Sequence, residues 1–318
     1  RIVEAAQWLE PTFGGVNLED IAAPKCFYIL EEARKRLSIP VWHDDQQGTA
    51  TIILAGVINA LKIVGKKIGE VQFSLIGAGA AIIMTAKILI KAGAKPGDII
   101  LVDRKGILSQ SRKDLQEAAK KDDLVGRWKW EICQVTNDEM REGGVEEAMA
   151  GADFCIAASR PGPGVIKKEW VRRMADNPVV FACANPTPEI WPGEAKEAGA
   201  KIVATGRSDF PNQVNNSLVF PGVFRGVLDV RARTITDEMC LAAARELASF
   251  AEARGISPEN IVPRMDEWLV YAKEAVACAQ KAMEQDVARL KLTRNELEDR
   301  ALSIIKSSRD IINLLAKK

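Results

Sequence analysis

The sequence lacks the cysteine and histidine patterns that indicate a disulfide framework or a zinc centre. Its six cysteines are scattered with no CxxC pair, and His43 is the only histidine among 318 residues. Several cysteines stand in apolar stretches, such as residues 154–156 and 181–183. We therefore expect reduced thiols in the core of a cytoplasmic protein. For His43 we expect a packing role with its polar atoms satisfied, and an acid–base or ligand role is the alternative.

The sequence also lacks an excess of charge of either sign. Lys and Arg number 44 against 43 acidic residues, so we expect no broad basic surface. This balance argues against nucleic acid or a membrane as a partner. The longest apolar runs are interrupted by Lys62 and Lys87, so no transmembrane helix is expected. An initiator methionine is absent too, and Arg1 reads as the middle of a helix, so we expect the true amino terminus to lie upstream.

Apolar strands and helices alternate along the chain. Hydrophobic residues make up 47% of it, enough for a large core and about two domains. The expected strands cover residues 41–45, 71–76, 99–102, 131–135, 154–158, 179–182 and 201–204. The expected helices cover residues 20–37, 49–64, 80–92, 112–120, 167–174 and 293–318. Strands rich in Val, Ile and Leu between helices predict an α/β fold with a doubly wound, mostly parallel Rossmann-like sheet.

Two pairs of adjacent carboxylates are the most informative local feature. Asp44 and Asp45 end a short apolar segment, and Glu19 and Asp20 lie upstream. Adjacent side chains on an extended segment point to opposite faces, so one Asp can face a metal while the other meets a different group. Oxygen donors without sulfur suit Mg²⁺ or Mn²⁺, so Glu19, Asp20 and Asp45 are candidate ligands. A plain helix cap is the alternative for Glu19 or Asp20.

A glycine-rich turn follows the second expected strand. Gly77-Ala78-Gly79 permits a tight turn and the close approach of a pyrophosphate. Ala80 and Ala81 then open a helix whose free N–H groups can face the phosphates. The same glycines could merely pack a helix against a strand, but the order strand, turn, helix favours a dinucleotide site.

Charged residues end the next expected strand. A carboxylate at Asp103 can accept a hydrogen bond from the adenosine ribose, and Arg104 or Lys105 could pair with a 2′-phosphate. The choice between NAD and NADP therefore stays open. The alternative is a solvated turn that happens to carry charges.

Uncharged polar residues follow later strands. Ser159 and Asn185 come after two expected strands, and Asn216 precedes an apolar segment. Open α/β sheets bind ligands at the carboxyl ends of their strands, where Ser159 could border a nicotinamide. Amides at Asn185 and Asn216 could hold a carboxylate or a carboxamide without adding charge. Turn formation is the alternative for all three.

Five segments, taken in order, closely resemble the malic enzyme family. They are residues 13–20 (FGGVNLED), 43–49 (HDDQQGT), 77–79 (GAG), 184–187 (ANPT) and 215–222 (NNSLVFPG). No segment is decisive alone, but the ordered set is specific and extends over nearly the whole chain. The modest length resembles the compact bacterial or archaeal type.

The resemblance implies oxidative decarboxylation of L-malate to pyruvate and CO₂, with NAD or NADP and Mg²⁺ or Mn²⁺. It implies the end of an amino-terminal substrate and metal domain over residues 1–43 and a nucleotide-binding domain over residues 44–285. Residues 286–318 would then form a helical carboxyl-terminal extension. A homodimer or a larger homo-oligomer is expected.

The resemblance also implies roles for particular side chains. The metal ligands would be Glu19, Asp20 and Asp45, Asp44 would lie beside the catalytic lysine, and Asn185 and Asn216 would contact substrate and nicotinamide. The family's catalytic tyrosine and lysine fall upstream of Arg1, so this chain is expected to lack them. Ile82 stands where the family usually has the third glycine of the nucleotide turn.

Two other functions fit parts of the pattern. An amino-acid dehydrogenase has a similar layout of two domains but needs no metal, so metal dependence would discriminate. A non-catalytic nucleotide-binding fragment would bind the cofactor without turnover.

Overall fold

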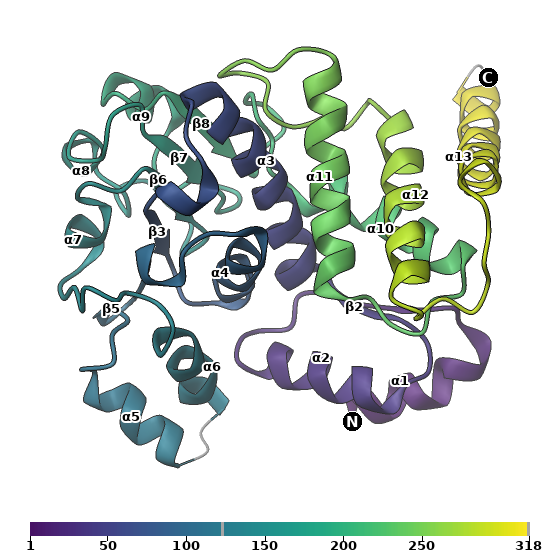
Figure 1. Ribbon diagram of the computed structural model, residues 1–318, viewed down its shortest axis with the longest axis horizontal. Helices are drawn as coiled ribbons and strands as arrows, with labels where there is room; N and C mark the ends of the chain where they lie inside the picture. The colour runs from purple at the N-terminus through teal and green to yellow at the C-terminus, as the bar shows by residue number, and fades with distance from the viewer. Residues whose placement is uncertain (122–123, 317–318) are drawn as a thin grey trace.

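A six-stranded sheet forms the centre of the molecule in the computed structural model, which describes residues 1–121 and 124–316 (Figure 1). The strand order is β5-β4-β3-β6-β7-β8, and all neighbours are parallel except β4 and β5. The strands are β3 (Phe73–Ile76), β4 (Ile99–Asp103), β5 (Gly106–Ile107), β6 (Phe154–Ala157), β7 (Val179–Ala182) and β8 (Ile202–Thr205). The predicted Rossmann-like sheet is confirmed, and its parallel strands bring their carboxyl ends to one edge.

Helices cover both faces of this sheet. They are α3 (Thr49–Val64), α4 (Ala80–Ala92) and α11 (Asp237–Ala253) on one face, and α7 (Val145–Met149), α8 (Lys168–Val171) and α9 (Pro192–Glu197) on the other. Phe73 and Phe154 face the first layer, while Cys155 and Val180 face the second. This alternation of buried side chains explains why the strands read as continuous apolar runs.

Helix α3 is the central helix of the core. With the turn before it, Asp44–Val64 is apolar and long enough to cross a membrane, yet 72% of its most apolar stretch is buried inside the molecule. Gly65 ends the helix in a left-handed conformation with φ +68°, as its sequence predicts. The apolar character of α3 is therefore explained by its position in the protein interior.

A smaller lobe precedes the sheet. Its elements are α1 (Ile2–Leu9), β1 (Val16–Leu18), α2 (Lys25–Arg36) and β2 (Val41–His43), with β1 and β2 paired in parallel. Leu18, Leu30 and Val41 belong to a core of its own. A π-helical turn, η2 (Asp44–Gly48), joins this lobe directly to α3.

The remaining helices lie outside these two layers of helices. They are α5 (Lys113–Lys120), α6 (Leu124–Cys133), α10 (Phe220–Asp229), α12 (Leu269–Glu284) and α13 (Arg294–Ala316). Single 3₁₀ turns cover Glu10–Thr12, Ile68–Glu70, Pro96–Asp98 and Asn216–Leu218. The predicted terminal helix corresponds to α13, and residues 317–318 of that prediction lie outside the described residues. Helix α13 packs on α12 through Ala301, while Ile311 and Ile312 are exposed.

One predicted strand is wrong. Residues 131–135 do not form a strand, because they end α6 and the turn that follows it. Trp128 and Ile132, four residues apart, bury the same face of this helix. An apolar run this short fits the period of a strand as well as that of a helix, and here it forms a helix with one buried face. The short antiparallel β5 occupies the sheet edge instead.

Two predicted boundaries near the acidic pairs are also wrong. The helix expected from residue 20 begins at Lys25, and Asp20 has a left-handed φ of +57°, so it does not cap the helix. The strand expected over residues 41–45 ends at His43, and Asp44 and Asp45 lie in the π turn. Their side chains diverge because they are successive residues of a helical turn, not because they alternate along a strand.

Candidate functional site

A groove of about 900 Å³ lies along the carboxyl ends of β3, β4 and β6. Gly77, Ala78 and Gly79 form its floor between β3 and the amino terminus of α4. Gly77 has φ +107°, and a Cβ there would stand 2.7 Å from the Ala158 carbonyl oxygen, so only glycine fits. Gly79 faces open space, which leaves room for a phosphate at the start of the helix.

Asp103 closes the groove at the end of β4. Its carboxylate accepts hydrogen bonds from Arg112 at 2.7 Å, from the Lys129 ammonium at 2.6 Å and from the Lys105 N–H at 2.9 Å. Burial alone would raise the pKa of Asp103, but these bonds more than offset it and lower the pKa. The carboxylate is thus ionised and fixed where a ribose would lie. Arg104 is exposed at the same edge.

Glu189 is a buried carboxylate that the sequence reading missed. Its Oε1 accepts hydrogen bonds from the Ser159 N–H at 2.8 Å and the Ser159 hydroxyl at 3.2 Å, and its Oε2 accepts one from the Ala184 N–H at 3.1 Å. Ser159 follows β6 and Ala184 follows β7, so one side chain joins two loops at the sheet edge. The sequence signal was a lone Glu between a proline turn and the buried Ile190.

Asp44 and Asn216 meet at the π turn. A Cβ on Gly48 would stand 2.2 Å from Asp44 Oδ1 and 2.9 Å from the Asn216 Cβ, so the bare backbone of Gly48 lets both side chains approach. Asp44 is buried, and its carboxylate accepts a hydrogen bond from the Trp42 ring N–H at 2.9 Å. Burial raises the pKa of Asp44 to about 6, and the nearby charges of Glu19 and Asp45 add to the rise.

Asn185 lies close to the backbone of a second glycine, Gly206. A Cβ on Gly206 would stand 2.9 Å from Asn185 Nδ2, and the Gly206 carbonyl accepts a hydrogen bond from the Asn215 amide at 3.1 Å. Asn215 precedes Asn216, so the loops after β7 and β8 bring both predicted amides to one region. Neither Asn185 nor Asn216 lines the groove itself, and Ala80 and Ala81 form the first turn of α4 beside it.

The three predicted metal ligands are brought only partly together. The Asp20 N–H donates to Asp45 Oδ2 at 2.9 Å, which joins the two acidic pairs, and Glu19 is exposed beside them. Across residues 1–121 and 124–316, no three His, Cys, Asp or Glu side chains converge closely enough to form a metal centre. The assignment of Glu19, Asp20 and Asp45 as ligands therefore stays a prediction.

His43 is buried, but within the described part of the chain it lacks the hydrogen-bond partners that the expected packing role requires. Its Nδ1 lies 3.7 Å from Asp45 Oδ2, and among the described residues neither ring nitrogen has a hydrogen-bond partner. Burial lowers the pKa of His43, although the Asp45 charge acts in the opposite direction. A neutral imidazole at the base of the acidic turn follows from this. The cysteines are free thiols, as expected, and all are buried except the partly exposed Cys183.

Known proteins resemble this chain across most of its length. Residues 46–283 match the family described as malic enzyme, NAD-binding domain. The bifunctional malic/malolactic enzyme of Bacillus subtilis is 44% identical over 96% of this chain and 72% of its own length. The NAD-dependent malic enzyme of Geobacillus stearothermophilus is 44% identical over 91% of this chain and 57% of its own length. The NADP-dependent malic enzyme of Escherichia coli is 41% identical over 91% of this chain and 38% of its own length.

The fold is shared with a solved structure as well. The crystal structure of the Entamoeba histolytica malic enzyme matches with a TM-score of 0.95 and 49% sequence identity. The match covers 99% of this chain and 64% of the Entamoeba chain. The relatives include NAD-dependent and NADP-dependent enzymes, so a nicotinamide nucleotide is the cofactor class they share. This chain spans between 38% and 72% of the curated relatives named above.

Proposed function

This chain belongs to the malic enzyme family, and from that premise we propose that it serves the oxidative decarboxylation of L-malate to pyruvate and CO₂ with NAD⁺ or NADP⁺. The observation that carries the proposal is the turn at Gly77 and Gly79, which opens a groove of about 900 Å³ at the amino terminus of α4. Backbone N–H groups there favour a pyrophosphate, and the family match includes this turn. The ribose would lie by Asp103, with Ser159 near the nicotinamide end.

The polar cluster around the π turn supports a substrate site. Asn216 and Asn185 would hold the substrate carboxylate or the carboxamide of the nicotinamide through their amides. Asp44 would orient the acid–base group of the reaction, because the Trp42 ring N–H fixes its carboxylate. Its burial excludes water from that contact. General acid–base groups typically contribute about 10²–10⁴-fold in rate, so their orientation matters.

The donor set suits a hard divalent cation. Glu19, Asp20 and Asp45 supply only oxygen, which Mg²⁺ and Mn²⁺ prefer. The fit rests on charge: burial raises the pKa of Asp44 most, the carboxylates of Glu19 and Asp45 raise it further, and a cation would offset their repulsion of the Asp44 charge. When bound, such a cation supplies Lewis acidity at the hydroxyl and carboxylate oxygens of the substrate.

The test is a steady-state assay with L-malate and Mn²⁺, run with NAD⁺ and with NADP⁺. Formation of reduced cofactor, pyruvate and CO₂ in equal amounts is expected of a chain that carries the acid–base groups of the reaction. Fluorescence titration of NADH with the same preparation separates a chain that binds the cofactor but lacks acid–base groups from one that binds no nicotinamide nucleotide. Failure to bind either reduced cofactor would refute the proposal, as would metal-independent oxidation of an amino acid.

A further inference from the structure

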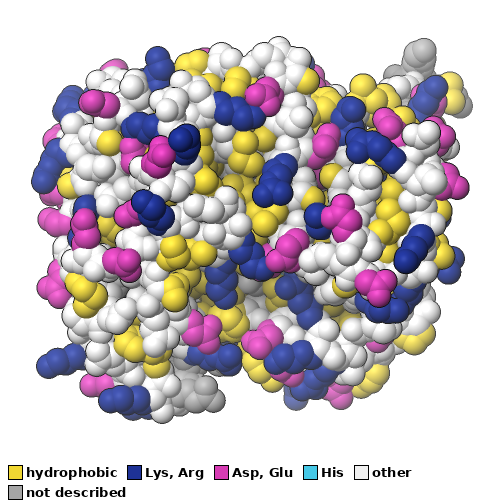
Figure 2. Space-filling model, viewed as in Figure 1, with side chains coloured by type: hydrophobic (Ala, Val, Ile, Leu, Met, Phe, Trp, Pro, Cys, Tyr) yellow, Lys and Arg dark blue, Asp and Glu magenta, His cyan; other side chains and the backbone are white. Residues whose placement is uncertain are grey.

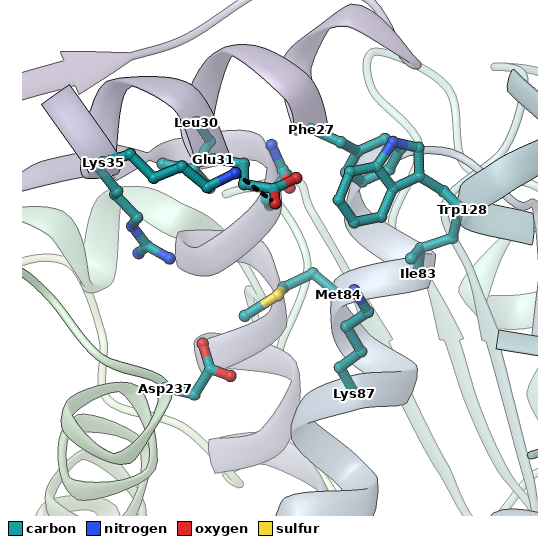
Figure 3. Close-up of a pocket in the computed structure, with 11 residues that line it drawn as sticks. Phe27, Leu30, Glu31, Lys35, Ile83, Met84, Lys87, Trp128 and Asp237 are labelled. Carbon is teal, nitrogen blue, oxygen red and sulfur yellow. Dashed lines mark hydrogen bonds and ion pairs between the residues drawn. The ribbon is translucent and has the colours of Figure 1, made fainter. Parts of the chain in front are cut away.

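A second pocket, of about 370 Å³, lies between α2, α4 and the amino terminus of α11 (Figure 3). Figure 2 shows this face hollowed between the two parts of the molecule, with Lys and Arg side chains around the hollow. Phe27, Ile83 and Trp128 line both this pocket and the cofactor groove, so they form a wall between the two. The cofactor site proposed above lies on the groove side of that wall.

Two cations of this pocket form no ion pair with a carboxylate of the described residues, although Asp237 and Glu31 lie in the same pocket. Within the described part of the chain, Lys87 makes no hydrogen bond or ion pair, and its ammonium lies 4.8 Å from the centroid of the Trp128 ring. Arg34 donates to the backbone carbonyls of Ile235, at 2.8 Å, and Val41, at 3.4 Å, rather than to an acidic side chain.

The acidic residues of the pocket already have partners. Glu31 pairs with Lys35 at 3.0 Å, as the dashed line in Figure 3 marks, and Asp237 pairs with Lys91 at 3.1 Å. The charge left over at the pocket is therefore positive.

Two buried donors of the pocket also lack acceptors. Gln46 is 3% exposed, and its Nε2 has no hydrogen-bond partner among the residues described. The same holds for the ring N–H of Trp128, in the part of the chain that the structure covers. Buried polar groups normally have partners, and leaving one unpaired costs about 1–3 kcal/mol. Every unpaired polar group named here is a donor, so the complementary ligand is a group of acceptors with negative charge.

The remaining walls are apolar. Leu30 and Met84 line the pocket beside the ring of Phe27, and Figure 3 shows Met84 between the Lys87 and Asp237 side chains. We propose that this pocket is a second ligand site, separate from the cofactor groove, which binds a small organic carboxylate with an apolar body. The carboxylate would meet Lys87 and the unpaired donors, and the apolar body would cover Leu30 and Met84.

Phenylacetate is a suitable probe, because it joins a carboxylate to an aromatic ring of a size that fits the pocket. Calorimetric titration of the full chain, with NADH held at saturation, should show binding that NADH does not displace. Phenylacetamide has the same shape without the charge and should bind at least about tenfold more weakly. Inorganic phosphate, titrated separately, distinguishes a phosphate source of the anion from a carboxylate source.

The variant that tests the site is Lys87→Met, which keeps the length of the side chain and removes the ammonium. Its affinity for phenylacetate should fall at least about tenfold. The control is Lys95→Met, the same change at an exposed lysine after α4, and it should bind as the parent chain does. Thermal unfolding of both variants verifies that the fold is kept.

Five results would overturn the proposal. Displacement of phenylacetate by NADH would place it in the cofactor groove. Equal affinity for acid and amide would leave only an apolar hollow. Binding of phosphate but not phenylacetate would refute the carboxylate. Binding of neither anion, or an unchanged affinity in Lys87→Met, would refute the site.

Discussion

Gly77 and Gly79 stand two residues apart, yet a side chain would meet different surroundings at each. At Gly77 a Cβ would approach the Ala158 carbonyl oxygen to 2.7 Å on a backbone with φ +107°. At Gly79 an added Cβ meets no atom of the described residues within 4 Å. A side chain at Gly77 would therefore clash with the backbone and destabilise the fold. A side chain at Gly79 would instead fill the space proposed for the cofactor phosphates.

For Gly79→Val we expect the affinity for NADH and for NADPH to fall at least about tenfold, because the side chain occupies the phosphate position. The midpoint of thermal unfolding should stay close to that of the parent chain. Fluorescence titration and calorimetry measure the two quantities. Gly193→Val, on α9 away from the groove, is the control and should leave both affinities unchanged. Unaltered cofactor binding in Gly79→Val would show that the phosphates bind elsewhere.

Glu189 offers a test of how the loops after β6 and β7 are held. In Glu189→Gln one side-chain oxygen becomes an NH₂ group, so either Ser159 or Ala184 loses its acceptor. An unpaired buried donor costs about 1–3 kcal/mol, and the loop that carries it should become mobile.

These loops lie beyond β3, away from Asp103. Binding of the nicotinamide half of the cofactor should therefore weaken more than binding of the adenosine half. We expect the affinity of Glu189→Gln for NADH to fall about fivefold or more, while the affinity for ADP changes little. Hydrogen exchange at the Ser159 and Ala184 amides should speed up. Glu197→Gln, an exposed residue paired with Lys168, is the control. An equal loss of ADP and NADH binding would contradict this division of the groove.

At the scale of elements, the sequence predicts the apolar strands of the sheet. It does not predict the elements whose form depends on contacts with distant segments. Strands β3, β4, β6, β7 and β8 are mostly apolar and buried on both faces, so their composition identifies them. The predicted strand at residues 131–135 is instead the end of α6 and the turn after it, because the burial of this helix depends on Phe27, whose ring lies 5.0 Å from that of Trp128. The predicted strand end at Asp44 and Asp45 is instead the start of the π turn, where Gly48 lies close to Asn216 from a distant segment.

The residues predicted to contact the cofactor are only partly brought together. Gly77, Ala78, Gly79, Asp103, Arg104 and Ser159 all line the groove, and their contacts with a cofactor stay a prediction. Glu189 was not recognised, because its role depends on two backbone N–H groups from separate loops. A single sequence does not state which loops meet.

Asp103 connects β4 to α5 and α6, and this connection bears on the choice of cofactor. It pairs with Arg112 before α5 and with Lys129 on α6. Asp103→Ala would leave both cations without this carboxylate beside the expected ribose. We expect NADH to bind more weakly and NADPH to bind as well or better, because a 2′-phosphate would replace the lost charge.

Parallel titrations with NADH and NADPH measure this shift of preference. Asp310→Ala, an exposed change on α13, is the control. A loss of the same size for both cofactors would mean that Asp103 supports the fold rather than selects the ribose.

At the scale of the whole molecule, the proposed substrate region lies where the smaller lobe meets the sheet. Glu19 and Asp20 come from the lobe, Asp45 from the π turn, and Asn216 from the far side of that turn. The lobe has a core of its own, and it also contacts the rest of the molecule through Trp42 in the main core and Phe27 against Trp128. The domain boundaries at residues 43 and 285 remain our proposal, and a ligand bound at the junction would join the two parts.

Binding of Mn²⁺ should therefore stabilise the molecule as a whole. A ligand that binds only the folded state raises the free energy of unfolding by about 2.7 kcal/mol when its concentration is 100 times its dissociation constant. We expect Mn²⁺ to raise the midpoint of thermal unfolding and to slow proteolysis of residues 1–43, and a chelator to reverse both.

In Asp45→Asn the effect should vanish, since the amide removes the charge of the half-exposed carboxylate beside the Asp20 N–H. Asp266→Asn, at an exposed surface carboxylate, should respond to Mn²⁺ as the parent chain does. If Asp45→Asn kept the full response to Mn²⁺, the metal would have to bind at another site, and the lobe would owe its position to protein contacts alone.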